Sequence, residues 1–189
     1  MKKLLFVASL LLVLGAGCAV GVPKIHQPTV EGDWYLAFDL PNSWLAAKPY
    51  QEPDQKLVTP VTTISRTDNE IVLQNTDKAI VRSDRTPDAA VPADSYVRLG
   101  TDYAQIVVTR LDTRRVIPSE AEDLNNGFSK LKSCDPGGEC QKNGRYNYEY
   151  YLKTEVENYK FTLYGDVGQI EAMERIIKSA QVVTAPSQE

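Results

Sequence analysis

The chain of 189 residues has the length of one domain with a short segment at each end. Apolar residues make up 42% and charged residues 24%, which is ordinary for a globular protein and excludes disorder of the whole chain. The formal net charge of −4 argues against the basic surface that nucleic acid requires, so no nucleic-acid partner is expected.

The first 18 residues have the layout of a bacterial export signal. Lys2 and Lys3 precede an apolar run over 4–14, and small residues then lead to Cys18. The apolar run is shorter than the about 20 residues that a membrane-spanning helix needs. Its end resembles the lipobox of bacterial lipoproteins, in which the cysteine is diacylated and becomes the first residue after cleavage. An ordinary secretory signal, cut elsewhere, is the alternative.

These features predict the organisation of the chain and its location. Diacylglyceryl on Cys18 is expected to anchor the protein to the membrane of the bacterial cell envelope, on the extracytoplasmic side. In some bacteria with two membranes, an Asp directly after the lipidated cysteine resembles an inner-membrane retention signal. Ala occupies that position here (Ala19), which favours the outer membrane where one exists. Cleavage removes two lysines and leaves 19 basic against 25 acidic residues, a balance of −6, so the body should stand off anionic headgroups. The expected segments are a signal peptide over 1–17, a flexible tether over 18–32, one domain over 33–184 and a disordered tail over 185–189.

The first half of the domain reads as short strands. Large apolar residues occupy every second position of 34–40, and Pro41 ends this strand. The segment 96–111 is predicted to form a hairpin whose turn lies at 100–102, and its continuous apolar run over 106–108 indicates a central strand covered on both faces. Three further short strands are predicted over 61–66, 70–74 and 79–82. The last two are expected to form a hairpin through the turn "NTDK".

A helix is predicted to open at Pro118 and Ser119. Ser119 and Glu122 have capping-box spacing, and three apolar residues then fall on one helical face: Leu124, Phe128 and Leu131.

The chain is predicted to close with a hairpin, a helix and a short strand. The two long strands are expected over 145–153 and 159–164. In the helix that follows, Ile170, Met173, Ile176 and Ile177 point inward. Many antiparallel strands with two late helices predict an α+β fold, an antiparallel sheet flanked by helices.

Residues with catalytic chemistry are few. The only histidine, His26, lies in the expected tether, which argues against Ser-His-Asp and Cys-His triads and against zinc sites of the hydrolase kind. The phosphate-binding and nucleophile-elbow motifs are absent. Among 25 carboxylates, the sequence singles out no acid/base pair. No catalytic residue, metal ligand or cofactor is therefore predicted.

The last hairpin is dense in tyrosine. Tyr146, Tyr148 and Tyr150 share one face of their strand and form a candidate binding face for a peptide or a sugar. Tyrosines also suit half-buried cross-strand pairs, so the same residues fit a packed core.

Cys134 and Cys140 flank a Pro-Gly-Gly turn. If Cys18 carries the lipid, these two remain as a pair in an oxidising compartment, where disulfides persist. Two thiolates without a nearby histidine make a poor zinc site, and the spacing is not the C-x-x-C of a redox pair. The sequence therefore predicts a disulfide between them.

Two stretches resemble the PsbP-like family, which is named for an extrinsic subunit of photosystem II and has relatives among bacterial lipoproteins. They are "FDLPNSW" (38–44) and "YKFTLYGDVGQIEAMERIIKSAQV" (159–182), which is similar to the closing strand, helix and short strand of that family. The resemblance implies an antiparallel sheet flanked by helices, an α/β/α sandwich. In photosynthetic members the domain binds a membrane complex and helps to retain calcium and chloride. The metal sites of that family use histidines, so no site residue carries over to this chain.

Two hypotheses for function follow. The first is a non-enzymatic, lipid-anchored binding or assembly module of the bacterial envelope, with an envelope protein as its partner. The second is an extracytoplasmic small-ligand-binding protein, or a carboxylate-dependent enzyme, whose site lies at the tyrosine-rich hairpin.

Overall fold

The fold is seen in a computed structural model. The residues that it describes are 34–47, 69–81, 93–94, 96–100, 102–111, 116–134, 140, 144–155 and 157–184. Cys18 and His26, together with the expected signal peptide, tether and tail, lie outside the described residues, as does the strand expected over 61–66.

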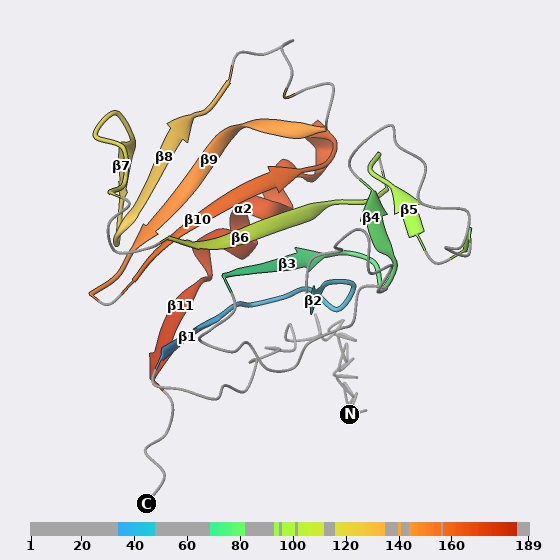
Figure 1. The fold of residues 1–189 in the computed structure, drawn as a ribbon, viewed down its shortest axis with the longest axis horizontal. Helices are drawn as coiled ribbons and strands as arrows, with labels where there is room; N and C mark the ends of the chain where they lie inside the picture. The colour runs from blue at the N-terminus through green and yellow to red at the C-terminus, as the bar shows by residue number, and fades with distance from the viewer. Residues whose placement is uncertain are drawn as a thin grey trace, which may run out of the picture.

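A seven-stranded antiparallel sheet forms the body of the domain (Figure 1). The strand that contains 106–108 is central, as predicted. Ile106 and Val108 pack into the main core on one face of the sheet, and Val107 packs into a smaller cluster on the other face. The strands in spatial order are β2 (Leu45–Ala47), β3 (Glu70–Gln74), β6 (Gln105–Leu111), β10 (Asn158–Tyr164), β9 (Arg145–Lys153), β8 (Phe128–Lys132) and β7 (Glu122–Asn125).

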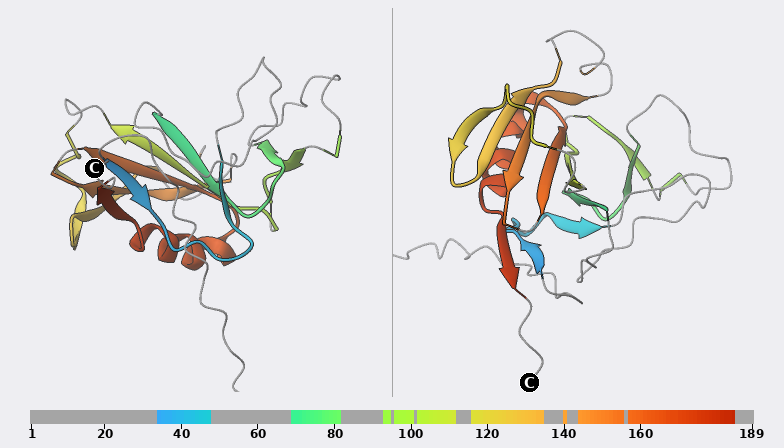
Figure 2. Two further views of the ribbon diagram at one scale, coloured as in Figure 1. Left: turned by 90° about the horizontal axis from the view of Figure 1, so that it is seen from below. Right: turned by 60° about the vertical axis from the view of Figure 1, so that its left-hand side comes forward.

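One face of the sheet is covered by a short helix, α2 (Ile170–Lys178), which follows a 3₁₀ turn, η1 (Val167–Gln169) (Figure 2, left). The helix buries Met173, Ile176 and Ile177 as the sequence predicts, because its apolar positions recur at helical spacing. Ser119 does not cap a helix, because the segment that follows it is not helical.

The predicted helix after Pro118 is wrong, since this segment forms the antiparallel hairpin β7–β8. Asn125, Asn126 and Gly127 have φ values of 73°, 52° and 80°, so three successive residues turn the chain in the left-handed region. Asn and Gly tolerate that region better than other residues, and Asn-Gly is a strong hairpin signal. The apolar spacing that suggests a helix also places Leu124 and Phe128 on one face of this hairpin.

The first and last described strands pair with each other. β1 (Trp34–Ala37) and β11 (Gln181–Thr184) form an antiparallel two-stranded ribbon in which Leu36 pairs with Val182. Leu36 and Phe38 enter the same core as the helix, and Phe38 meets the ring of Phe161 edge to face, with centroids 6.3 Å apart.

The two hairpins predicted in the first half are wrong. β4 (Ala79–Val81) and β5 (Tyr96–Arg98) pair in parallel as a separate sheet (Figure 1). β3 cannot pair with β4 because its two edges are taken by β2 and β6. The Asn75 side chain instead ties the end of β3 to the segment before β6, since its amide donates to the Asp102 carbonyl and its oxygen accepts from the Ala104 N–H, both at 2.8 Å.

The described residues thus form a mostly antiparallel β fold with one short helix. The α+β prediction holds at this coarse level, and its second flanking helix is replaced by a hairpin. Within the described part of the chain, no helix is long and apolar enough to cross a membrane.

Candidate functional site

The sheet is wider than the helix that covers it. An α-helix is about 10 Å across, whereas seven strands spaced about 4.8 Å apart extend over about 29 Å. Glu174 of α2 reaches Tyr150 on β9 and Lys130 on β8, so the helix lies over that part of the sheet. The outermost hairpin, β7–β8, extends beyond the helix and curls down beside it (Figure 2, left).

This arrangement leaves a half-open groove of about 680 Å³, which we call the hairpin groove. Its walls are the β7–β8 hairpin, the end of β9 and the segment from the end of α2 to the start of β11. Its floor consists of buried or half-buried apolar side chains: Leu124, Phe128, Tyr150, Leu152, Ala180 and Val182. Its rim carries exposed polar side chains: Asn125, Asn126, Lys153, Glu155, Lys178 and Gln181.

The candidate tyrosine face lies on the helix side of the sheet. Tyr150 is only 1% exposed, and its hydroxyl donates a hydrogen bond to Glu174 on α2. Burial, and next the hydrogen bond to Glu174, raise the pKa of Tyr150 well above its ordinary value. This tyrosine therefore stays neutral and serves as a donor that fixes the helix on the sheet, and it is also one of the residues that line the hairpin groove.

Lys130 completes this cluster. Its ammonium lies 3.4 Å from the Glu174 carboxylate and 4.3 Å from the centre of the Tyr148 ring, where a cation–π attraction operates. Tyr146 and Tyr148 are half-buried, pack against the main core, and have ring centres 5.4 Å apart. The three predicted tyrosines are thus brought together against the core. Lys130 lies over the rings of Tyr148 and Tyr150, and Tyr150 is the one of the three that lines the groove.

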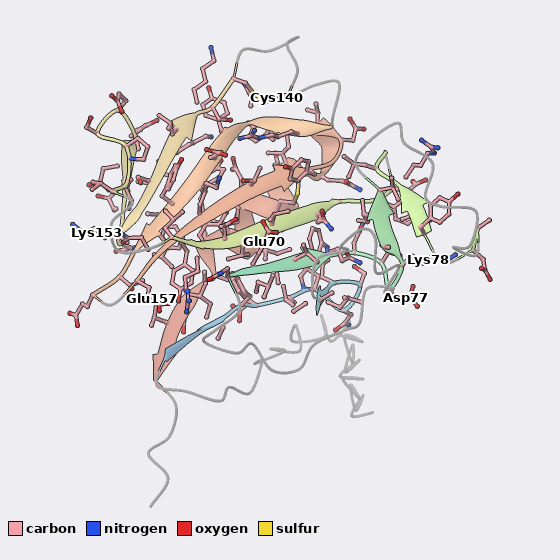
Figure 3. All side chains as sticks on the ribbon, viewed as in Figure 1. Glu70, Asp77, Lys78, Cys140, Lys153 and Glu157 are labelled. Carbon is pink, nitrogen blue, oxygen red and sulfur yellow. A yellow bond between two sulfur atoms is a disulfide. The ribbon has the colours of Figure 1, made fainter. Side chains whose placement is uncertain are left out.

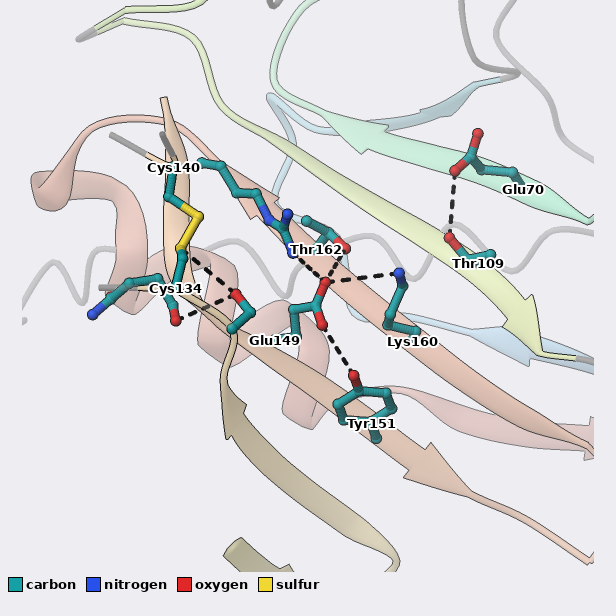
Figure 4. A network of polar contacts seen from close by, with 11 residues as sticks. Glu70, Thr109, Cys134, Cys140, Glu149, Tyr151, Lys160 and Thr162 are labelled. Carbon is teal, nitrogen blue, oxygen red and sulfur yellow. Dashed lines mark hydrogen bonds and ion pairs between the residues drawn. A yellow bond between two sulfur atoms is a disulfide. The ribbon is translucent and has the colours of Figure 1, made fainter. Parts of the chain in front are cut away.

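A second polar cluster lies on the opposite face of the sheet around Glu149, which is 7% exposed (Figure 4). One of its carboxylate oxygens accepts from Tyr151 at 2.9 Å. The other accepts from Arg145 and lies 3.7 Å from the Lys160 ammonium. Because Glu149 and its partners sit on neighbouring strands β9 and β10, we interpret the cluster as a cross-strand network that holds the long hairpin together.

The two cysteines of the predicted disulfide lie at bonding distance, with their Cα atoms 6.4 Å apart (Figure 4). Cys134 follows β8, and the Ser133 N–H beside it donates to the Asn147 carbonyl on β9 at 2.8 Å. The bridge therefore braces the connection between β8 and β9. It does not join a helix to the hairpin, because β8 is a strand.

Side chains with metal-binding chemistry do not gather in the described residues, where no group of three or more His, Cys, Asp or Glu is close enough to hold an ion. No sequence pattern singles out Lys153 at the end of β9 (labelled in Figure 3) or Lys178 at the end of α2, which the fold brings to the same groove. No local pattern could have found them, since they are 25 positions apart and meet only through the sheet and helix packing. The Asn126-Gly127 dipeptide is the local signal that could have predicted the β7–β8 hairpin, which forms another wall of the groove.

Comparison with protein-family models, with curated proteins and with solved structures finds no match to this chain.

Proposed function

We propose that this protein is a non-enzymatic binding module, held on the outer face of a bacterial membrane by a lipid on Cys18, and that the hairpin groove is its binding site. The observation that carries the binding role is the groove itself, a concave site with an apolar floor and a polar rim. Small-molecule sites have this composition, and their volumes fall between about 300 and 1,000 Å³. The envelope location rests on the leader sequence.

The enzymatic alternative calls for two carboxylates that converge on the groove. Among the described residues that line it, Glu155 is the one acidic side chain. Glu174 is not among the lining residues, and its carboxylate is bonded to Tyr150 and paired with Lys130. Carboxylates arranged in this way support a binding role more than acid/base catalysis.

We also infer a relationship to the PsbP-like family. The order β10, α2, β11 is the strand, helix and strand that the resemblance implies for the end of the domain. The antiparallel sheet supports the same inference, and the full α/β/α sandwich remains part of the proposal.

The test is native mass spectrometry of the protein recovered from cell envelopes. A matched pair of variants comes from one hairpin: Leu124→Arg places a charge in the groove, and Leu131→Arg places it on the other face of β8, since the partner of Leu131 in register is Glu149. We expect a bound species on the wild type and on Leu131→Arg, and its loss from Leu124→Arg. If none is bound, and membrane pull-downs recover no partner that depends on Leu124, the groove is not a binding site.

A further inference from the structure

The charges on the rim of the hairpin groove differ from those of the protein as a whole. The chain is acidic, with a formal net charge of −4, yet the charged side chains lining the groove are Lys153, Lys178 and Glu155. Both lysines are exposed, and neither has an ion-pair partner among the described residues. The groove thus carries a local excess of one positive charge.

The floor of the groove is an apolar strip that reaches the solvent. Leu152 and Ala180 are 5% and 7% exposed, whereas Leu124 and Phe128 on the hairpin are only half-buried. Half-buried apolar side chains that line one concave strip favour an apolar ligand over a polar one.

A small ligand fits this groove better than an added peptide strand does. A peptide would pair with β7, the edge strand, whose exposed side chains include Glu122 and Asp123. Charges on an edge strand oppose the addition of another strand. The groove is also concave and about 680 Å³, a size that encloses a small molecule.

We propose that the hairpin groove binds a single-chain amphiphile with a carboxylate head, whose alkyl chain lies along the apolar floor and whose head lies near Lys153 and Lys178. Because this inference names the ligand class of the same groove, it rests on the proposed function. The local excess of positive charge attracts an anionic head, and a carboxylate monoanion matches it with a smaller loss of hydration than a phosphate dianion. A lysine acts as a point charge without a fixed fork, so charge, and not geometry, selects the head group.

The test is calorimetric titration of the protein as it is recovered from cells, with four probes that each have one chain of twelve carbons. The probes are dodecanoate, dodecyl phosphate, dodecyl maltoside and dodecyl trimethylammonium, each below its micelle-forming concentration. We expect dodecanoate to bind most tightly and the trimethylammonium probe least tightly.

The variants separate the head from the chain. Exposed charge pairs are weak, so the double variant Lys153→Ala, Lys178→Ala should weaken dodecanoate binding by about 10-fold and leave dodecyl maltoside unchanged. Lys132→Ala removes a charge from the same hairpin outside the groove and should change neither. Leu124→Ser should weaken every probe, whereas Leu131→Ser should weaken none.

Several results would overturn the inference. Equal binding of dodecanoate and dodecyl maltoside, unaffected by the lysine variants, would show a groove without charge selection. Tighter binding of dodecyl phosphate would contradict the monoanion match. If no amphiphile binds while native mass spectrometry still shows a species that depends on Leu124, the ligand class is wrong and the proposed binding role stands. If that species is also missing, both fail.

Discussion

The substitution Gly127→Ala distinguishes the observed hairpin from the helix that the sequence pattern suggests, because the two structures predict effects of opposite sign. In an exposed helix, replacing Gly with Ala stabilises by about 1 kcal/mol. In the hairpin, Gly127 has φ of +80°, where a non-glycine residue costs about 1–2 kcal/mol. A Cβ there would also lie 2.7 Å from the Lys153 carbonyl oxygen, which is backbone and cannot turn away.

Relief of such a contact requires the turn and the end of β9 to move apart. Overpacking of this kind costs typically about 1–3 kcal/mol, so the two contributions together should lower the free energy of unfolding by about 2–5 kcal/mol. The Lys153 N–H donates to the Gly127 carbonyl at 2.8 Å, and the same movement would weaken this bond.

The assay is urea denaturation of wild type, Gly127→Ala and a control, Gly168→Ala. A Cβ on Gly168 would meet nothing within 4 Å, so the control should stay within about 0.5 kcal/mol of the wild type. A Gly127→Ala protein as stable as the wild type, or more stable, would refute the hairpin and restore the helix.

Three further predictions concern the anchor, the disulfide and a buried tyrosine. Cys18→Ala should release the protein from membranes, which fractionation measures, and removal of 19–32 should leave the thermal midpoint nearly unchanged; retention or a large shift would contradict the anchor or the tether. Replacing Cys134 and Cys140 with Ala should cost about 2 kcal/mol in denaturation because the bridge closes a short loop with a separation of 6 residues, and two free thiols in unreduced wild type would contradict it. Burial, and then the charge of a neighbouring carboxylate, raise the pKa of Tyr151 from 10.0 to about 12. The unfolded chain ionises first, so stability that is present below pH 10 should be lost as the pH rises toward 12. Tyr151→Phe should reduce this loss and remove one late step in tyrosinate absorbance.

The end of the domain could be predicted from the sequence because its signals are local. The strands predicted over 145–153 and 159–164 are found as β9 and β10, which pair as neighbours in the sheet. The helix after them keeps its apolar positions, including Met173 and Ile177, on one face. Local periodicity was sufficient where each element pairs with its neighbour in the chain.

The rest could not be predicted because it depends on pairing between distant segments. Nothing near residues 70–82 indicates that β3 pairs with β6 while β4 leaves for another sheet. Spacing of apolar residues alone also fits two structures at Leu124 and Phe128, and the positive φ of Asn125 decides between them. The hairpin groove forms only when these strand pairings are in place and the outer hairpin, β7–β8, curls down beside the helix.

The ribbon of β1 and β11 has a consequence for how the chain folds. The register joins Trp34 to Thr184, so the first and last strands that the structure describes close against each other across 150 positions. Contacts between such distant segments form slowly, because the loop between them must be closed first. During synthesis β1 emerges early and has no ribbon partner until the final strand is made, which leaves its edge open to other chains in the meantime. The ribbon is therefore completed only when β11 has been made, and a chain that stops short of β11 lacks the strand that pairs with β1.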